Sequence, residues 1–235
     1  MYNDSLQPVK CHCVTMSIPS DNDWPAPDPS DPGRERIIMA AREQLRLDDI
    51  ASFSLDAVAR RAGVTRMTVY NKFGSKAGLL EEVFDLLLER GAFREMPNAF
   101  KEPDVGRALD AFVGILGRFY TENRAVLVSL SAAAGQDPDL DRAMQNKSDR
   151  RRLAIETLVR RLGKERIPAV PASELVNTVD VLVTFNTFNA LAGADRTPTD
   201  VTPLVRQLLR SLLGLPASPQ PSAKRGSTRK QPRRR

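Results

Sequence analysis

The sequence contains few of the side chains from which metal centres, disulfide frameworks and many catalytic sites are built. Cysteine occurs only as Cys11 and Cys13, and the sole histidine, His12, lies between them. Three adjacent ligands without a fourth make a poor tetrahedral metal site, so we favour an unstructured leader over a soft-metal site here. The chain also has no Glu-x-x-His pair, glycine-rich phosphate loop or Gly-x-Ser-x-Gly turn. We therefore expect no enzyme, no cofactor and no metal.

Long apolar runs and the layout of a secretion signal are missing as well. No run of about 18 apolar residues occurs, and the N-terminus does not place basic residues ahead of an apolar stretch. Scarce cysteine agrees with a reducing compartment. These absences favour a cytoplasmic protein that is neither secreted nor inserted in a membrane.

Aromatic residues are also scarce, at 6% of the chain, whereas hydrophobic residues reach 41%. Ala, Leu, Arg and Glu recur throughout, which predicts an all-α fold with enough apolar side chains for a core. Prolines every few residues block helix between positions 16 and 33, and the last twenty residues carry seven bases and no acid. We expect residues 1–33 to be a disordered arm and residues 216–235 a disordered basic tail, which either contacts DNA phosphates or only aids solubility.

Apolar periodicity between these ends predicts about nine helices. Residues 34–80 are expected to form a first domain of three helices, and residues 81–215 a second helical domain. Glycine and proline residues mark the expected ends of these helices. The expected helices cover residues 34–47, 55–62, 66–73, 76–90, 104–121, 124–134, 138–163, 173–193 and 200–214.

The second and third of these helices form a helix-turn-helix pattern. Ser54 and Thr65 are good N-caps for the two helices, and Gly63 suits the left-handed turn between them. Val69 and Phe73 are spaced to face inward. The helical repeat then places the remaining side chains on the outward face, namely Thr65, Arg66, Met67, Thr68, Tyr70, Asn71 and Lys72. A hairpin that only packs is the alternative, but it would not need these side chains.

This set of side chains suits duplex DNA. Arg66 can donate two hydrogen bonds to guanine, and Asn71 can pair with adenine. The methyl groups of Met67 or Thr68 can meet the thymine methyl. Phosphate contacts are expected from Thr65, Tyr70, Lys72 and Lys76.

The segment AVARRAGVTRMTVYNKFGSKAGLL resembles the DNA-binding region of TetR-family regulators. The likeness lies in the Ala-Gly-Val turn, in a Tyr followed three positions later by Phe, and in a Lys before a Leu pair. It implies base contacts from Arg66, Met67, Thr68 and Asn71, although many members have a small residue where this chain has Met67. The resemblance further implies a homodimer on a palindromic DNA operator, most simply a repressor, released by a small-molecule effector.

The second domain offers candidates for both dimerisation and effector binding. Apolar residues surround the helix expected at 173–193 and line the last helix, which predicts a four-helix dimer interface with Val181, Phe185, Phe188, Val205, Leu208, Leu209 and Leu212. The candidate effector contacts are Phe112, Leu116, Phe119, Tyr120, Arg151, Asn186 and Asn189. Gly114 and Gly117 would open room beside the aromatic residues, although plain core packing explains the same stripe. Arg151 belongs to the basic run Arg150–Arg152, which a solvated helix face explains; the alternative is that Arg151 meets an acidic ligand or Glu156.

Overall fold

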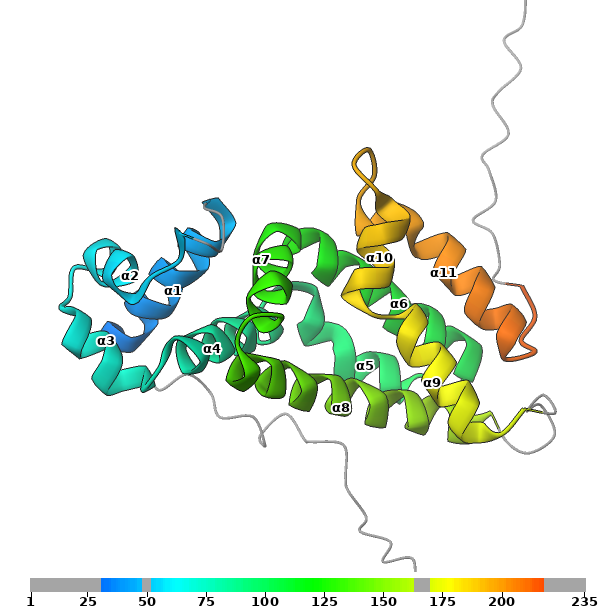
Figure 1. The fold of residues 1–235 in the computed structure, drawn as a ribbon. Helices are drawn as coiled ribbons and strands as arrows, with labels where there is room; N and C mark the ends of the chain where they lie inside the picture. The colour runs from blue at the N-terminus through cyan, green and yellow to red at the C-terminus, as the bar shows by residue number, and fades with distance from the viewer. Residues whose placement is uncertain (1–30, 48–51, 163–169, 218–235) are drawn as a thin grey trace, which may run out of the picture.

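A computed structural model describes residues 31–47, 52–162 and 170–217 of the chain (Figure 1). The Cys11–Cys13 leader, most of the N-terminal arm and almost all of the basic tail lie outside these residues. Within them the fold is all-helical, as predicted. The helices are α1 (Pro32–Leu47), α2 (Leu55–Ala62), α3 (Arg66–Phe73), α4 (Lys76–Leu88), the 3-10 helix η2 (Gly91–Glu95), α5 (Met96–Lys101), α6 (Val105–Glu122), α7 (Arg124–Ala134), α8 (Pro138–Arg161), α9 (Ala172–Leu182), α10 (Phe185–Ala192) and α11 (Pro198–Leu212).

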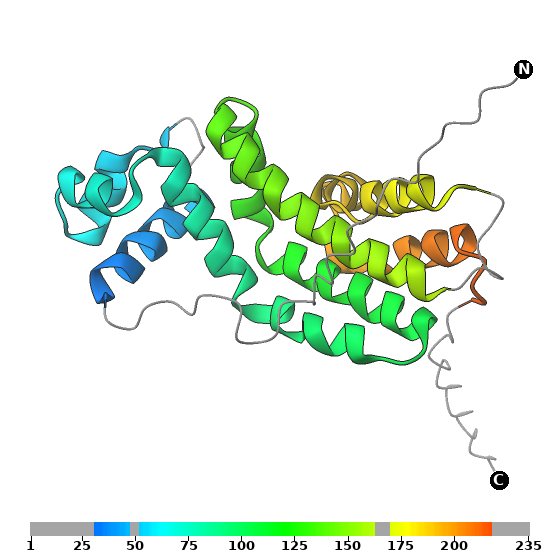
Figure 2. The same cartoon turned by 90° about the horizontal axis from the view of Figure 1, so that it is seen from below.

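Helices α1 to α3 form one end of an elongated molecule, and α9 to α11 lie at the other end (Figures 1 and 2). Helix α4 leads from the first group towards α8, and α6 runs through the second group with most of its side chains buried. Apolar side chains from both groups belong to one continuous core. The helix-turn-helix is therefore attached to the rest of the chain through packed helices.

Caps define the two helices of the helix-turn-helix as the sequence predicts. The Ser54 hydroxyl accepts a hydrogen bond from the Ala57 N–H, and the Thr65 hydroxyl accepts one from the Thr68 N–H. Gly63 between them has a φ of 66°, a left-handed conformation that glycine adopts without strain. These local interactions fix where α2 ends and α3 begins.

Two regions differ from the expected helices. The single helix expected at 173–193 is divided into α9 and α10, because the Thr184 side chain caps α10 by accepting from the Thr187 N–H. The connection between α4 and α6 contains η2 and α5. Pro97 is compatible with α5 because it lies in the first turn, where a backbone N–H would have no acceptor within the helix. The helix count of about nine was therefore too low for the described residues.

The space beside the glycines of α6 is filled, which favours the core packing that the sequence offered as an alternative to a cavity. A Cβ atom at Gly117 would lie 2.1 Å from the Thr202 hydroxyl, and one at Gly114 would lie 2.2 Å from an Arg206 guanidinium nitrogen. Both neighbours belong to α11, so the missing side chains let α11 approach α6 closely. The space that the sequence indicated is filled by the protein itself.

Candidate nucleic-acid interface

Helix α3 presents most of its surface to solvent. Val69 is fully buried and anchors the helix to the core, whereas Met67 and Tyr70 are 64% and 57% exposed. Arg66 and Asn71 are also exposed. Met67 and Tyr70 are three positions apart, so they lie side by side on the helix surface and form a small apolar patch among polar side chains. The helix therefore has the form of a reading helix, with an inward anchor and an outward polar and apolar face.

The two ends of this face are ordered by local hydrogen bonds. The Thr65 hydroxyl lies 2.9 Å from the Thr68 hydroxyl, in addition to capping the helix. At the other end, Gly78 permits α4 to start close to α3, because a Cβ atom there would lie 2.3 Å from the Phe73 carbonyl oxygen. The Gly78 N–H is taken by the Ser75 hydroxyl, so this amide at the start of α4 already has an acceptor.

Arg66 projects from the first turn of α3 and pairs with an aspartate of α2. Its Nη1 atom lies 3.0 Å from the Asp56 Oδ2 atom, and both side chains remain largely exposed. The guanidinium has five N–H donors in a fixed fork. Donors are therefore left for a base edge while one contacts Asp56.

The predicted phosphate ligands Lys72 and Lys76 have intramolecular partners as well. The Lys72 ammonium pairs with Asp31, directly ahead of α1, and this hydrogen bond lowers the pKa of the Asp31 carboxyl. The Lys76 ammonium lies 3.3 Å from the Phe53 carbonyl oxygen and 5.3 Å from the centre of its ring. Lys76 thus stabilises the junction of α2 and α4.

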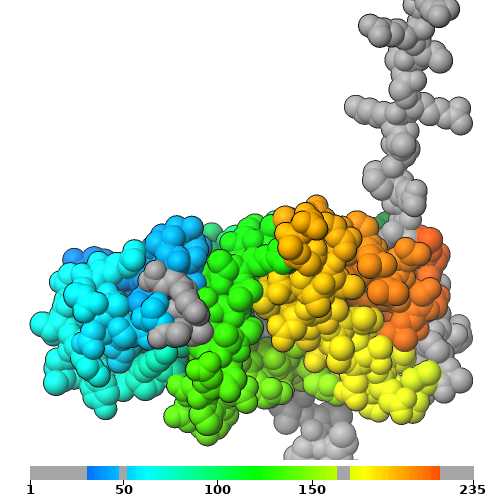
Figure 3. Space-filling view, turned by 45° about the horizontal axis from the view of Figure 1, so that its top comes forward, coloured from blue at the N-terminus to red at the C-terminus, as the bar shows by residue number. Residues whose placement is uncertain are grey.

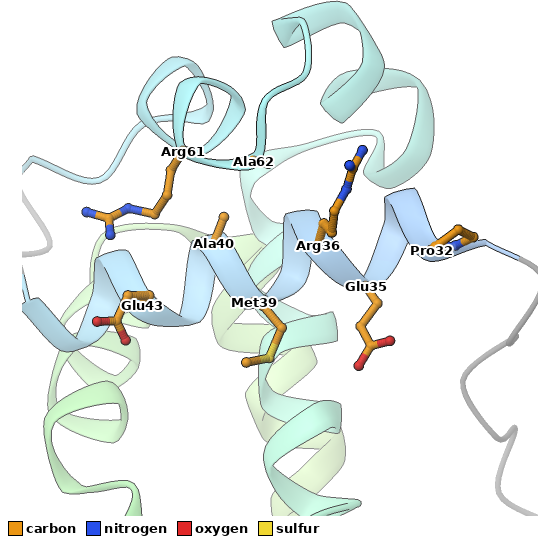
Figure 4. Close-up of a pocket in the computed structure, with 8 residues that line it drawn as sticks. All are labelled: Pro32, Glu35, Arg36, Met39, Ala40, Glu43, Arg61 and Ala62. Atoms are coloured by element: carbon orange, nitrogen blue, oxygen red, sulfur yellow. The ribbon is translucent and has the colours of Figure 1, made fainter.

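A shallow groove of about 560 Å³ lies across α1 beside α2, outside the residues that the sequence singled out (Figure 4). Its lining carries charges of both signs, with Glu35 and Glu43 opposite Arg36 and Arg61. Glu35 pairs with Arg90 of the segment after α4, and Glu43 pairs with Arg46. The acids are thus neutralised by neighbours. The groove adds exposed arginines to the domain but no enclosed ligand cavity.

The aromatic effector candidates of the second domain are packed on one another. Phe112, Leu116, Phe119 and Tyr120 are all buried, and the Tyr120 ring lies within 6 Å of the rings of Phe119, Phe185 and Phe188. The Tyr120 hydroxyl donates to the Val183 carbonyl oxygen at 2.8 Å. Burial raises the pKa of Tyr120 to about 12. The core interpretation of this stripe is the one that the contacts support.

The polar effector candidates differ in their partners. Arg151 pairs with Asp180 of α9 at 2.8 Å, a partner that the sequence did not indicate, while Glu156 lies near Arg152. Asn189 accepts a hydrogen bond from Arg124 Nε at 2.7 Å, and Asn186 is exposed. Arg151 also interacts with the Tyr120 hydroxyl, whereas Asn186 and Asn189 lie on α10.

The predicted dimer residues divide into two groups. Phe188, Val205 and Leu209 are completely buried because α10 and α11 pack on α6, so their side chains already have partners within one subunit. Val181 and Leu208 are 62% and 42% exposed, and Phe185 and Leu212 are half-buried. Leu204, one turn before Leu208, is exposed too and was missed. Helices α9, α10 and α11 lie together on the surface at the end opposite the helix-turn-helix (Figure 3).

The described helices, which leave out residues 1–30, 48–51, 163–169 and 218–235, include none that is long and apolar enough to cross a membrane.

Comparison with known proteins places the helix-turn-helix in a family. Residues 37–83 match the family of bacterial regulatory proteins described as the tetR family. The HTH-type transcriptional regulator AlkX of Mycobacterium tuberculosis is 32% identical over 108 residues, which are 46% of this chain and 50% of that protein. The chain thus spans about half the length of this curated relative.

Solved structures extend the likeness to most of the fold. NalD of Pseudomonas aeruginosa, the secondary repressor of the MexAB-OprM multidrug efflux pump, is similar with a TM-score of 0.60 and 19% identity, over 78% of this chain and 97% of NalD. A TetR transcription regulator from Haloarcula marismortui is similar with a TM-score of 0.63 and 18% identity, over 79% and 97%. The matched residues include α2, α3 and the exposed face of α3, so the helix-turn-helix region of this chain is similar to that of the TetR family of bacterial regulatory proteins.

Proposed function

We propose that this protein is a repressor of transcription that binds a palindromic DNA operator as a homodimer and is released by a small molecule. The observation that carries the proposal is the face of α3, on which Arg66, Met67, Tyr70 and Asn71 project from a helix anchored by Val69. A helix of this kind fits the major groove, where side chains read base edges. Arg66 and Asn71 supply hydrogen bonds, and Met67 supplies an apolar contact for thymine methyl groups.

Dimerisation is proposed through the surface of α9 and α11. Val181, Leu204 and Leu208 expose apolar side chains there, and a two-fold interface would bury them on both subunits at once. Two copies related in this way present two copies of α3. Spacing them by about 34 to 36 Å, or a multiple of it, would match successive turns of the major groove.

The proposal of repression and of its release by an effector is based on the similarity to NalD and on how a DNA-bound dimer would act. NalD, which shares the fold, is a repressor. A dimer seated on an operator blocks polymerase without further contacts, and an effector that favours a different spacing of the two α3 helices lowers operator affinity. Tyr120, Arg151 and Asn189 already have intramolecular partners. Arg151 contacts Asp180 through Nε and Asn189 accepts through Oδ1, so the remaining nitrogens of both side chains can still donate to an effector.

Fluorescence anisotropy with the full chain and duplexes from its own upstream region tests DNA binding. Arg66→Ala should relax the preference at one base position by about 1 to 3 kcal/mol, because a bidentate contact to guanine is lost. Arg142→Ala is the matched control, since Arg142 is an exposed arginine paired with Asp139 on α8. Wild-type protein that binds no upstream duplex in a salt-dependent manner would contradict the proposal.

Analytical ultracentrifugation tests the dimer. The double variant Val181→Asp/Leu208→Asp should sediment as a monomer at concentrations where the wild type is a dimer, since charges would replace exposed apolar contacts at the two-fold interface. Val128→Asp, at an exposed position on α7, is the control and should leave the dimer intact. An unchanged dimer in the double variant would remove these residues from the interface.

A further inference from the structure

The two basic residues of α3 are both neutralised by aspartates from outside the helix. Arg66, at its first position, pairs with Asp56 of α2 at 3.0 Å. Lys72, in its last turn, pairs with Asp31 ahead of α1. Each contact thus joins the reading helix to a different element. In the absence of DNA, both cationic side chains of α3 are therefore already paired with carboxylates.

Both aspartates are held in place by more than the cation. Asp31 also accepts a hydrogen bond from the Arg34 N–H at 3.0 Å, which ties it to the start of α1. Asp56 lies in the first turn of α2, where the helix dipole favours a negative charge. Since the Lys72 hydrogen bond lowers the pKa of Asp31, this carboxylate is charged at neutral pH. These groups are fixed anions next to the DNA-facing surface.

We propose that Asp31 and Asp56 are specificity-determining residues, which act as built-in counterions and weaken binding to arbitrary DNA more than binding to the operator. This inference rests on the proposed function. Binding to arbitrary DNA depends on phosphate contacts, and each one gains free energy from the release of mobile counterions. The released counterions are cations that condense on the DNA, and a lysine or arginine that stays paired with a fixed carboxylate does not displace one from a phosphate. Phosphate must therefore compete with the aspartate for that side chain.

A guanine edge is affected differently because it is neutral. Arg66 contacts Asp56 through Nη1, and the other nitrogens of the fork can still donate to the two guanine acceptors. Asp56 can thus orient Arg66 towards a base while repelling a phosphate at the same position. The aspartate consequently favours base reading over backbone binding.

Asp56→Asn and Asp31→Asn test the inference, since each removes a charge and keeps the size of the side chain. The full-length variants are titrated against a random-sequence duplex and an upstream-region duplex of equal length at several salt concentrations. Each variant should bind the random duplex severalfold more tightly, with a slope of log affinity against log salt that is steeper by about 0.9. The gain on the operator-containing duplex should be smaller, so the ratio of the two affinities falls.

Asp139→Asn is the matched control, because Asp139 pairs with Arg142 on exposed α8 and its loss changes the net charge equally. The inference is overturned if Asp56→Asn equals Asp139→Asn on the random duplex, or if both duplexes gain by the same factor. Wild-type protein that does not distinguish the two duplexes would remove the proposed function and this inference together. Discrimination by the wild type that Asp56→Asn and Asp31→Asn leave unchanged would remove only the inference.

Discussion

At the scale of single residues, Tyr120 is strongly affected by its surroundings. Its hydroxyl is buried and donates to the Val183 carbonyl, and burial raises its pKa from 10.0 to about 12. Between these values the unfolded chain loses a proton that the folded chain retains. The free energy of unfolding must therefore fall as the pH rises from 10 towards 12.

Tyr120→Phe should remove this contribution to the pH dependence. It should also lower the free energy of unfolding at pH 7 by about 1 kcal/mol, because the Val183 carbonyl loses its donor. Urea unfolding at pH 7 and at pH 10.5 measures both effects. Tyr70→Phe, at an exposed tyrosine, is the control. If the two variants show the same pH dependence, the hydroxyl of Tyr120 is not the group responsible.

At the scale of elements, the contact of α6 with α11 depends on two glycines that differ in their neighbours. Alanine at Gly117 would meet the Thr202 hydroxyl, which is buried and donates to the Pro198 carbonyl. Alanine at Gly114 would meet the end of the Arg206 side chain, which can shift at the cost of its hydrogen bond to the Asp110 carbonyl oxygen. Gly117→Ala should therefore lower the free energy of unfolding by about 1 to 3 kcal/mol through overpacking.

Gly114→Ala should be nearly neutral, since helix propensity favours alanine by about 1 kcal/mol and the arginine can move. Thermal and urea unfolding of both variants test the difference. Equal losses would mean that α6 and α11 do not approach one another as closely at Gly117 as described.

The bounds of the helices follow from local sequence signals, whereas the neighbours against which each helix packs do not. Ser54, Gly63 and Thr65 act within four residues of the chain, so the bounds of α2 and α3 were predictable. Thr184, a residue type that is neutral inside a helix, gave no comparable sign that it would cap α10. Apolar residues around α10 and α11 indicated burial on more than one side. Periodicity alone did not show which side faces α6 and which faces solvent.

The reading face was predictable for a similar reason, but its electrostatic setting was not. Val69 and Phe73 define the inner side of α3, and the exposed side follows from the helical repeat. Lys72 and Asp31 are 41 positions apart, so their contact depends on how α1 crosses α3. Sequence reasoning therefore named the cations of the site and missed their anions.

At the scale of the whole molecule, α4 and α8 join the helix-turn-helix to the second group of helices. Lys147 of α8 has a side chain only 9% exposed, 2.5 Å from an Asp85 oxygen and 3.6 Å from a Glu81 oxygen, both on α4. A second link lies between α7 and α1, where the Ser129 hydroxyl donates to the Leu45 carbonyl at 3.0 Å. The position of α3 relative to the second group thus depends on two polar contacts as well as on apolar packing.

Lys147→Met should lower the free energy of unfolding by about 1 to 3 kcal/mol, because it leaves two carboxylates one helical turn apart without a cation. The loss should stay below that of a fully buried pair, since Asp85 and Glu81 are partly exposed. Arg142→Met on the same helix breaks an exposed pair and should have an effect under about 0.5 kcal/mol. Adding Asp85→Asn to Lys147→Met should restore part of the loss. No recovery in the double variant would mean that Lys147 stabilises the junction through the packing of its stem and not through its charge.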